Sequence, residues 1–242
     1  MHTFLLSDLH LSLDNPNVIA AFLNFLSKQA PSAESIYILG DLFEYWIGDD
    51  GVEHIGALEI LHAMQVLSKK LPCFFIPGNR DFLVRDCFSE RSGFTLLADE
   101  TVIDLYGVPT LILHGDSLCT ADTKHQQFRT NFVSNKMVCD LLLAKPLKER
   151  IALAREARSK SQTKDNNMND KIMDVTESAV LDAFRKHQVT QMIHGHTHRQ
   201  AVHKHHYDAI ARYRYVLGDW HKTSSVLVAN AEGLNIINTE IA

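Results

Sequence analysis

The chain has 242 residues, of which 45% are hydrophobic and 22% charged. These values are ordinary for a folded protein, and the length suits one sizeable globular domain with room for an insertion. They exclude a membrane-spanning protein, because no stretch approaches the roughly 18 uninterrupted apolar residues that a span requires. The N-terminus carries no basic leader or cleavage-site pattern, and the four cysteines form no C-x-x-C pair. We therefore expect a cytoplasmic protein with reduced thiols.

The net charge of −5 is distributed unevenly along the chain. Residues 123–164 contain ten Lys/Arg and three Asp/Glu, a balance of +7, so the rest of the chain carries −12. A basic segment beside an acidic body favours contact with anionic phosphates or lipid headgroups, although a solvated helical face has the same pattern. A nuclease usually shows a long basic stripe with stacking aromatic residues, so we expect no nucleic-acid partner.

Apolar runs of strand length recur along the chain, with helix-period stretches between several of them, including residues 17–28 and 53–70. The runs are TFLL (3–6), SIYILG (35–40), CFFIP (73–77), VPTLILH (108–114) and QMIHG (191–195). This alternation predicts an α/β layered fold. Near the C-terminus RYRYVLGDW, SSVLVAN and GLNIIN predict antiparallel strands, with a hairpin turn at Glu232–Gly233. Two sheets between layers of helices would satisfy the whole pattern.

Between these strands lies a segment of different character. From about residue 122 to 186 strand patterns are missing and helix formers dominate, with the polar stretch SQTKDNNMND between two helical patterns. We interpret residues 122–186 as a helical cap inserted into a body made of residues 1–121 and 187–242.

A polar cluster follows each of five predicted strands. The clusters are Asp8-Leu-His10, Gly40-Asp41, Gly78-Asn79-Arg80-Asp81, His114-Gly115-Asp116 and His194-Gly195-His196-Thr197-His198. Loops at the carboxyl ends of strands in an open α/β sheet meet in one crevice, so these clusters can converge. Singly, such motifs are more often helix caps and turns. Five in order, each after an apolar strand, favour a shared site.

The residue types in these clusters suit two divalent ions. Carboxylates, imidazoles and an amide oxygen are ligands for Mn²⁺, Fe²⁺ or Zn²⁺, and no thiolate is needed. Two ions roughly 3.5–4 Å apart can activate a water and neutralise phosphate oxygens, so no serine or cysteine nucleophile is required. Asp41 is the carboxylate expected to bridge the two ions. The sequence therefore predicts a two-metal phosphoesterase.

The motif set D-x-H, GD, GN[HR][DE], HG and GH-x-H resembles that of the calcineurin-like metallophosphoesterases. The longer stretches SDLHLS, YILGDLFEYWIGDD, FIPGNRDFL, LILHGDSLCTAD, IMDV and IHGHTHRQAVH, between residues 7 and 203, are similar to those of the family members that hydrolyse UDP-2,3-diacylglucosamine. The resemblance implies a four-layer α/β/β/α sandwich with an inserted helical cap. It also implies cleavage of the substrate pyrophosphate at the α-phosphorus, giving UMP and 2,3-diacylglucosamine 1-phosphate for lipid A biosynthesis.

The resemblance further implies two bound ions, both Mn²⁺. One ion would be held by Asp8, His10, Asp41 and His198, and the other by Asp41, Asn79, His114 and His196. The residues expected to be catalytic are Asp41, Asn79, Arg80 and His114, with the Arg80 guanidinium clamping the phosphate. The expected substrate-binding residues are Asn79, Arg80, Asp122, Ser161, Lys164 and His196. The sequence departs from the family pattern here, because Asp165 and Met168 stand where the family has Asn and Lys.

On the same resemblance the protein would lie on the cytoplasmic face of the inner membrane. The basic cap residues would attract anionic headgroups. Apolar cap positions would either line an acyl-chain slot or pack against the body: Phe132, Val133, Met137, Leu141, Leu142 and Leu143. Two other functions remain open: a phosphodiesterase for other nucleotide or generic phosphodiester substrates, and a non-catalytic scaffold that retains the fold.

Several polar residues near the motifs are interpreted as structural. We expect Asp49 and Asp50 to cap a helix. Asp81 and Asp116 are expected to orient neighbouring ligands, and His194 to lie near the strand end. Three histidines resemble a chelator, but for them surface solvation is the favoured interpretation: His203, His205 and His206.

Overall fold

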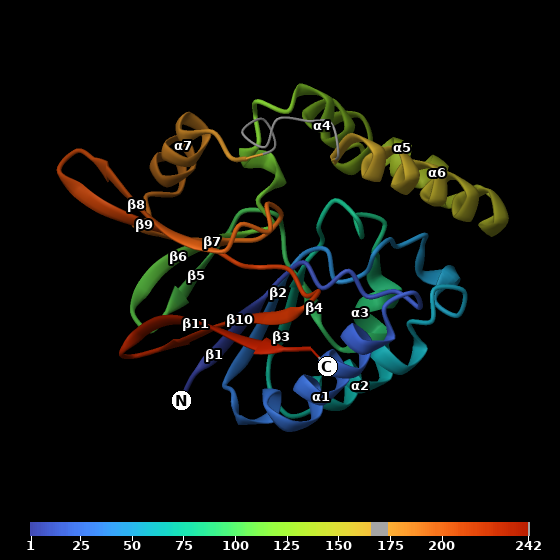
Figure 1. Ribbon diagram of the computed structural model, residues 1–242, viewed down its shortest axis with the longest axis horizontal. Coiled ribbons are helices and arrows are strands. Elements are labelled where there is room, and N and C mark those ends of the chain that lie inside the picture. Colours follow the sequence, from blue (N-terminus) through green and yellow to red (C-terminus); the bar gives the residue numbers. More distant parts are fainter. Residues whose placement is uncertain (166–173, 242) are drawn as a thin grey trace.

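Two β-sheets lie face to face in the centre of the molecule, and helices cover their outer faces (Figure 1). The computed structural model describes residues 1–165 and 174–241, without the side chains of residues 160–165 and 207. No helix in this described part is long and apolar enough to cross a membrane. The layers follow the order helix, sheet, sheet, helix, so the predicted four-layer fold class is confirmed.

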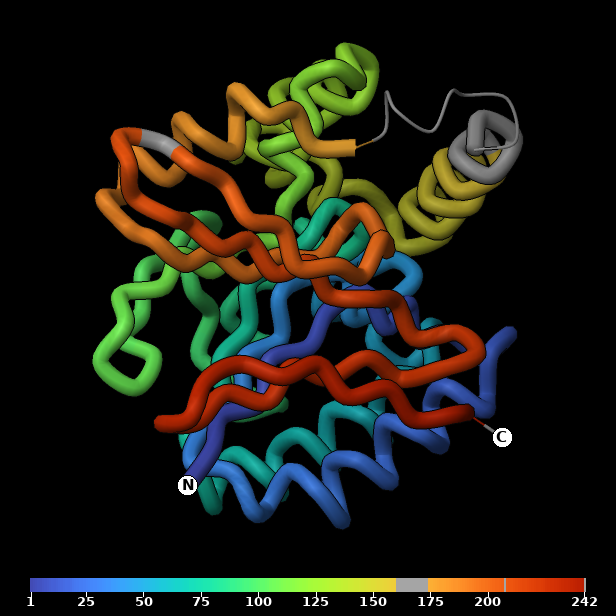
Figure 2. The backbone as a smooth tube through the Cα atoms, turned by 60° about the vertical axis from the view of Figure 1, so that its left-hand side comes forward, coloured from blue at the N-terminus to red at the C-terminus, as the bar shows by residue number. Residues whose placement is uncertain are grey.

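The first sheet has the strand order β11-β10-β1-β2-β3-β4. Its strands are β1 (Thr3–Leu6), β2 (Ser35–Leu39), β3 (Cys73–Ile76), β4 (Thr95–Leu96), β10 (Thr223–Asn230) and β11 (Gly233–Glu240). Strands β1 to β4 run parallel, whereas β10 pairs antiparallel with β1 and so places the C-terminal hairpin beside the first strand (Figure 2). The C-terminal hairpin is confirmed, with its turn between Asn230 and Gly233.

The second sheet has the order β5-β6-β7-β9-β8. Its strands are β5 (Thr101–Leu105), β6 (Val108–Leu113), β7 (Gln191–His194), β8 (Ala201–Tyr207) and β9 (Ile210–Val216). Here β6, β7 and β9 run parallel, and β5 and β8 pair antiparallel at the two edges. Two of the central parallel strands, β6 and β7, end in polar clusters predicted from the sequence.

The unbroken apolar run TFLL is explained by burial on both faces of β1. Phe4 and Leu6 pack under the helices of the first sheet, whereas Leu5 points into the core between the two sheets. Parallel strands covered on both sides require such runs rather than an alternation of apolar and polar residues. The inter-sheet core also contains Ile112 and Ile193 of the second sheet.

Helices cover both sandwich faces. The outer face of the first sheet carries α1 (Pro16–Lys28), α2 (Leu58–Ser68) and α3 (Asp86–Ser92), and that of the second sheet carries α7 (Glu177–His187). Val180, Ala183 and Phe184 of α7 contact Leu111 and Met192 of the second sheet. Although α7 lies within the predicted cap range, it therefore forms the fourth layer. The cap boundaries at 122 and 186 stay a prediction.

The remaining helices lie over one end of the sandwich (Figure 1). They are α4 (Thr123–Phe128), a π-helical turn (Arg129–Val133), α5 (Lys136–Leu143) and α6 (Leu147–Asp165). Buried or half-buried arginines connect them to the body: Arg150 pairs with Asp50, and Arg129 with Asp99 and Asp116. Asp50 is thus an ion-pair partner of the cap, and its predicted role as a helix cap was wrong. Asp49 does cap α3, accepting a hydrogen bond from the Phe88 N–H (3.0 Å).

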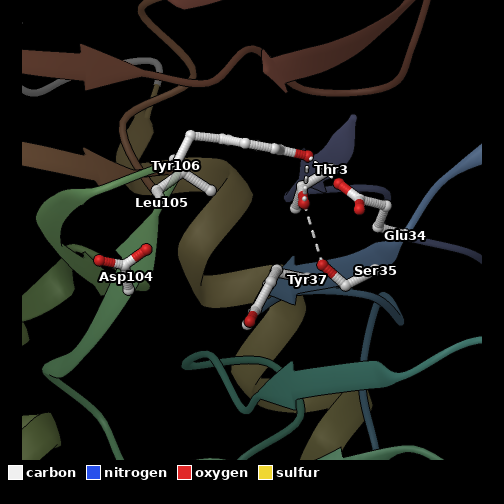
Figure 3. Close-up of a pocket in the computed structure, with 7 residues that line it drawn as sticks. All are labelled: Thr3, Glu34, Ser35, Tyr37, Asp104, Leu105 and Tyr106. Carbon is white, nitrogen blue, oxygen red and sulfur yellow. Dashed lines mark hydrogen bonds between the residues drawn. The ribbon is translucent and has the colours of Figure 1, made fainter. Parts of the chain in front are cut away.

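A hollow of about 270 Å³ lies between the sheets at the ends where β1 and β2 begin (Figure 3). The Tyr106 side chain spans from the β5–β6 turn to the first sheet, where its hydroxyl donates to Glu34 Oε2 (2.7 Å). Beside it Thr3 Oγ1 lies 3.0 Å from Ser35 Oγ. Because the motif clusters follow the opposite ends of β1 and β2, this hollow is separate from the candidate active site.

The packing of α7 predicts a large effect of truncating its central aromatic residue. Phe184→Ala should lower the free energy of unfolding by about 3–5 kcal/mol, since it leaves a cavity against the second sheet. Denaturant titration would measure the loss. Leu181→Ala, a half-buried position one turn earlier, is the matched control and should cost no more than about 1 kcal/mol. Equal small losses at both positions would contradict the fourth layer.

Candidate active site

The five motif clusters meet at the carboxyl ends of the strands. Backbone hydrogen bonds join the loops directly: Asp8 N–H donates to Gly40 O (3.1 Å), and His10 N–H to Asp41 O (3.0 Å). The Gly195 N–H donates to His114 O (2.9 Å), which links the two loops of the second sheet. These bonds join four of the clusters, and Asn79 of the fifth lies 3.0 Å from His114, so the structure brings the predicted ligands to one place.

Five of the predicted ligands have left-handed backbone conformations. Their φ values are 55° for Asp8, 47° for His10, 52° for Asp41, 66° for His196 and 57° for His198. A non-glycine residue in this region costs about 1–3 kcal/mol and persists only where its surroundings determine it. Concentration of such residues in one site indicates that the fold is strained in order to aim these side chains.

Two glycines of the motifs are required by close contact with carboxylates. A Cβ atom at Gly78 would lie 2.2 Å from Asp41 Oδ1, and one at Gly195 would lie 2.2 Å from Asp8 Oδ2. Both distances are far below van der Waals contact, and the neighbouring atoms cannot move without displacing a predicted ligand. The glycines therefore allow the backbone to approach the carboxylates.

The first group of candidate ligands contains Asp8, His10 and His198, whose donor atoms all lie within 4.8 Å of one another. His10 Nε2 lies 3.2 Å from His198 Nε2, which in turn lies 3.4 Å from Asp8 Oδ1. Asp8 is fully buried, and its Oδ1 has no hydrogen-bond partner among the described residues. A buried carboxylate oxygen facing two imidazole nitrogens fits a divalent cation.

The second group contains Asp8, Asp41 and His114, again within 4.8 Å. His114 Nε2 lies 3.5 Å from Asp41 Oδ1 and 3.0 Å from Asn79 Oδ1, and the His196 ring centroid is 5.0 Å from that of His114. The carboxylate common to both groups is Asp8. A bridging role for Asp41 stays a prediction, although Asp41 belongs to the second group as expected.

Each of three histidines presents Nε2 to the centre because an acceptor engages or faces its Nδ1. His114 Nδ1 donates to Leu39 O (2.9 Å), His10 Nδ1 lies 3.6 Å from Glu44 Oε2, and His198 Nδ1 lies 3.7 Å from Asp219 Oδ2. The bond to Leu39 O fixes the tautomer of His114, as such partners do for metal-binding histidines, whereas the carboxylates that face His10 and His198 lie beyond hydrogen-bond distance. Glu44 and Asp219 were not identified from the sequence, although both stand beside motif residues, in GDLFE and GDWH.

The charges of the site favour a cation. Burial lowers the pKa of His114, but the carboxylates of Asp41, Asp8 and Asp116 outweigh it and raise this pKa to about 9. Burial likewise opposes ionisation of Asp8, yet the imidazole of His198, whose Nε2 lies 3.4 Å from Oδ1, holds the pKa of Asp8 well below its usual range. This negative potential retains a proton on His114, where divalent ions would otherwise balance the charge. The residues present therefore fit a two-metal centre.

Two acidic residues were predicted to orient neighbouring ligands, and their contacts differ. Asp81 is buried and accepts the N–H groups of Gly78 (2.6 Å) and Leu42 (2.7 Å), joining the loops that carry Asn79 and Asp41. Asp116 accepts from Arg129 Nε (3.1 Å), which connects the loop after β6 to the cap. The contacts of Asp81 agree with the expected role, whereas Asp116 binds a cap arginine and its role in orienting a ligand stays a prediction.

Arg80 lies at the edge of the metal site. Its Nε is 4.0 Å from Asp41 Oδ2, and its side chain is 21% exposed. The same Nε has no hydrogen-bond partner within the described chain. A guanidinium with an unused donor, next to the candidate ligands and open to solvent, is placed to bind an anion.

Two histidine predictions have different outcomes. His194 ends β7 as expected, and its ring donates from Nδ1 to Gly195 O (2.8 Å) and accepts at Nε2 from Arg214 (3.0 Å). Surface solvation is confirmed for His203 and His206, which are exposed, but it was wrong for His205. His205 is buried and hydrogen-bonded to Glu177 and Arg214, because α7 covers this part of β8.

The predicted substrate-binding residues of the cap are only partly described. The Asp122 carboxylate accepts the His125 N–H (2.9 Å) and so caps α4. The side chains of Ser161 and Lys164 lie outside the described residues. One further residue was not identified from the sequence: His125, whose ring centroid lies 5.0 Å from that of His196 and whose Nε2 is buried without a hydrogen bond in the described structure.

Residues 1–200 match the family model of the calcineurin-like phosphoesterases. The chain belongs to this family, and it is a hydrolase of the metallophosphoesterase class. Proteins named UDP-2,3-diacylglucosamine hydrolase from Yersinia pestis and from Yersinia pseudotuberculosis serotype I (strain IP32953) are each 45% identical over 238 residues, which is 98% of both chains. An archaeal phosphodiesterase of known structure, 11% identical, superposes with a TM-score of 0.50 over 99% of this chain and 100% of its own, and shares the fold.

Removal of Asp41 should abolish both metal loading and hydrolysis. Asp41→Ala takes away a buried carboxylate beside Asn79 and His114. The transition state would then lose several kcal/mol of stabilisation by the metal ions, which lowers the hydrolysis rate about a thousandfold or more. Metal content per chain after dialysis against Mn²⁺, measured by mass spectrometry, and hydrolysis rate would be compared with those of the parent. Asp104→Ala is the control, because Asp104 is an exposed residue of β5 at the opposite end of the sandwich. Unchanged metal content in Asp41→Ala would refute the ligand assignment.

Proposed function

We propose that the protein hydrolyses the pyrophosphate bond of UDP-2,3-diacylglucosamine at the α-phosphorus, releasing UMP and 2,3-diacylglucosamine 1-phosphate. The observation that carries this proposal is the 45% identity, over 98% of both chains, to proteins named for hydrolysis of this compound. The convergence of the predicted ligands at one end of the sandwich supports it. On this proposal the enzyme acts in lipid A biosynthesis.

We further propose that two Mn²⁺ ions bind in the site. One would be held by Asp8, His10, Asp41 and His198, and the other by Asp41, Asn79, His114 and His196. When bound, such ions supply an activated water and neutralise charge on the phosphate oxygens. The donor set, with imidazole and carboxylate but no thiolate, supports a borderline or hard ion.

The protein groups around the centre have separate tasks in this proposal. Arg80 forms charge-assisted hydrogen bonds to the phosphate through its unused donor, and these strengthen as charge develops on the phosphate oxygens. Asn79 Oδ1 and His114 Nε2 lie 3.0 Å apart, and both are proposed to act at the same ion of the centre. Asp122, Ser161, Lys164 and His196 are proposed to contact the rest of the substrate from the cap side.

A row of aromatic rings connects the site with the cap surface and supports a lipid substrate. Phe82 follows Arg80 by two residues and packs edge-on against Phe128 (centroids 5.9 Å apart), which stacks on Phe132 (5.4 Å). Phe132 is partly exposed. An acyl chain whose headgroup is bound at Arg80 could extend along this apolar row, which a nucleotide or protein substrate would not need.

The exposed face of α5 supports contact with a membrane. Met137 is 74% and Leu141 63% exposed, whereas Leu142 and Leu143 on the other side of the helix pack against the body. Lys136 and Lys145 flank the apolar positions and are exposed. Apolar side chains bordered by cations suit an anionic bilayer surface. We propose peripheral contact with the cytoplasmic face of the inner membrane at this helix.

Substrate preference tests the proposed reaction. UDP-2,3-diacylglucosamine should be hydrolysed far faster than bis-p-nitrophenyl phosphate. Arg80→Ala should lower kcat/KM for UDP-2,3-diacylglucosamine by about 10²–10³-fold, which is the usual effect of removing one donor that stabilises developing charge. Arg91→Ala, at an exposed position of α3, should leave the rate unchanged. Equal rates for the lipid nucleotide and the generic diester would contradict the proposal and favour a general phosphodiesterase.

The membrane proposal is tested separately with vesicles. The double variant Met137→Asp, Leu141→Asp should bind vesicles of phosphatidylethanolamine and phosphatidylglycerol at least about tenfold more weakly, because it removes apolar surface and adds negative charge. Cosedimentation measures binding. Val108→Asp, at a partly exposed apolar position on β6 at the opposite end of the sandwich, should not change it. Unaltered binding of the double variant would exclude α5 as the contact while leaving the hydrolase assignment intact.

A further inference from the structure

A chain of four polar side chains, of which three are buried and one, Glu177, is exposed, lies behind the loop that carries His196 and His198. It runs from Glu177 of α7 through His205 of β8 and Arg214 of β9 to His194 of β7. We propose that Arg214 is a positioning residue, which orients this metal-binding loop and Asp8 by fixing the tautomer of His194. The proposal rests on the proposed two-metal function, because it assigns a role toward that site.

Burial makes the contacts of Arg214 consequential. Arg214 is 5% exposed and His194 is fully buried. A buried guanidinium without compensating partners is costly, so its hydrogen bonds determine where it lies. The guanidinium donates from Nη1 to His194 Nε2 (3.0 Å) and from Nε toward His205 Nε2 (3.4 Å). It therefore connects two imidazoles that come from different strands.

The hydrogen-bond partners of the His194 imidazole allow only one of its two neutral tautomers. A guanidinium N–H can only donate, so Nε2 of His194 must accept. A backbone carbonyl can only accept, so Nδ1, which lies 2.8 Å from Gly195 O, must carry the proton. The same reasoning holds for His205, whose Nδ1 lies 2.8 Å from Glu177 Oε1. In both histidines Nδ1 therefore donates and Nε2 accepts.

The proton on His194 Nδ1 acts on the peptide between Gly195 and His196. The carbonyl of this peptide accepts from His194, and its N–H, which belongs to His196, donates to Asp8 Oδ2 (2.9 Å). One rigid peptide plane therefore joins His194 to the Asp8 carboxylate. With Oδ2 held in this way, Oδ1 is directed toward His10 and His198, where it has no hydrogen-bond partner in the described chain.

The consequence is that Arg214 affects the metal site across three hydrogen bonds. Without the guanidinium, His194 could place its proton on Nε2, and the Gly195 carbonyl would lose a donor. The peptide that precedes His196 would then be less constrained, although His196 must keep a left-handed φ of 66°. Outer partners of this kind commonly change metal affinity by about 10–100-fold.

The experiment compares Arg214→Met with a matched control on the same strand. Arg214→Met keeps an unbranched side chain of four heavy atoms and removes every donor. Arg212→Met removes an arginine that is nearly as buried, two residues away, whose Nη1 donates to Ile210 O (3.3 Å). Arg214→Lys restores one donor and should recover part of any loss. The full-length chain is used throughout.

Two readouts separate positioning from a general loss of stability. Imidazole ¹⁵N NMR of the metal-free protein should show His194 and His205 with the proton on Nδ1, and Arg214→Met should convert His194 to a mixture of tautomers. Mn²⁺ affinity, measured by titration calorimetry, should fall about 10–100-fold in Arg214→Met. Hydrolysis should then be lost at limiting Mn²⁺ and largely recovered at saturating Mn²⁺. Arg212→Met should change none of these.

An Arg214→Met protein with an unchanged His194 tautomer and unchanged Mn²⁺ affinity would overturn the proposal. Should this variant fail to fold, the parent spectrum decides, because a proton on His194 Nε2 would be incompatible with donation by Arg214. The spectra are recorded without metal, so they test the relay independently of activity. Failure of the parent protein to bind Mn²⁺ would instead count against the proposed function.

Discussion

Burial of two carboxylates at the ends of parallel strands is the constraint on which the rest of the site depends. Asp8 and Asp41 lie almost completely out of water and close to each other, where two negative charges are unfavourable without compensation. Backbone N–H groups and imidazoles compensate them in part: His196 N–H donates to Asp8, and Arg80 N–H to Asp41. The remaining potential, visible in the raised pKa of His114, is what a pair of divalent cations would neutralise.

The architecture explains how this cost is tolerated. Parallel strands buried on both faces hold the loop ends rigidly, while glycines and left-handed residues let the backbone surround the carboxylates. Polar contacts around the site also hold its loops in place: Asp81 joins two loops, and Asp49 caps α3 nearby. The hydrogen-bonded chain through Arg214 extends from α7 to the loop after β7. The cap is attached to the same loops, since Arg129 pairs with Asp116. Short polar contacts therefore connect the candidate active site with the cap and with the two sheets.

Local patterns in the sequence predicted the features that depend on local chemistry. The run TFLL predicted β1 at its observed bounds, and the polar clusters after the strands predicted which loops converge. Features that depend on partners distant in sequence were not predictable in this way. Asp50 pairs with Arg150, a hundred residues later, and His205 is buried only because α7 covers β8. Glu44 and Asp219 likewise acquire their roles from histidines brought to them by the fold.

The central claim is that these side chains surround two cations, and its most direct test is a crystal structure of the protein grown with Mn²⁺, using anomalous scattering at the manganese edge. The account predicts two anomalous peaks about 3.5–4 Å apart, the usual spacing of two-metal hydrolytic sites. One peak would lie among Asp8, His10 and His198, and the other beside Asp41 and His114. A map without peaks at these side chains at millimolar Mn²⁺, or with manganese bound only elsewhere on the surface, would contradict it.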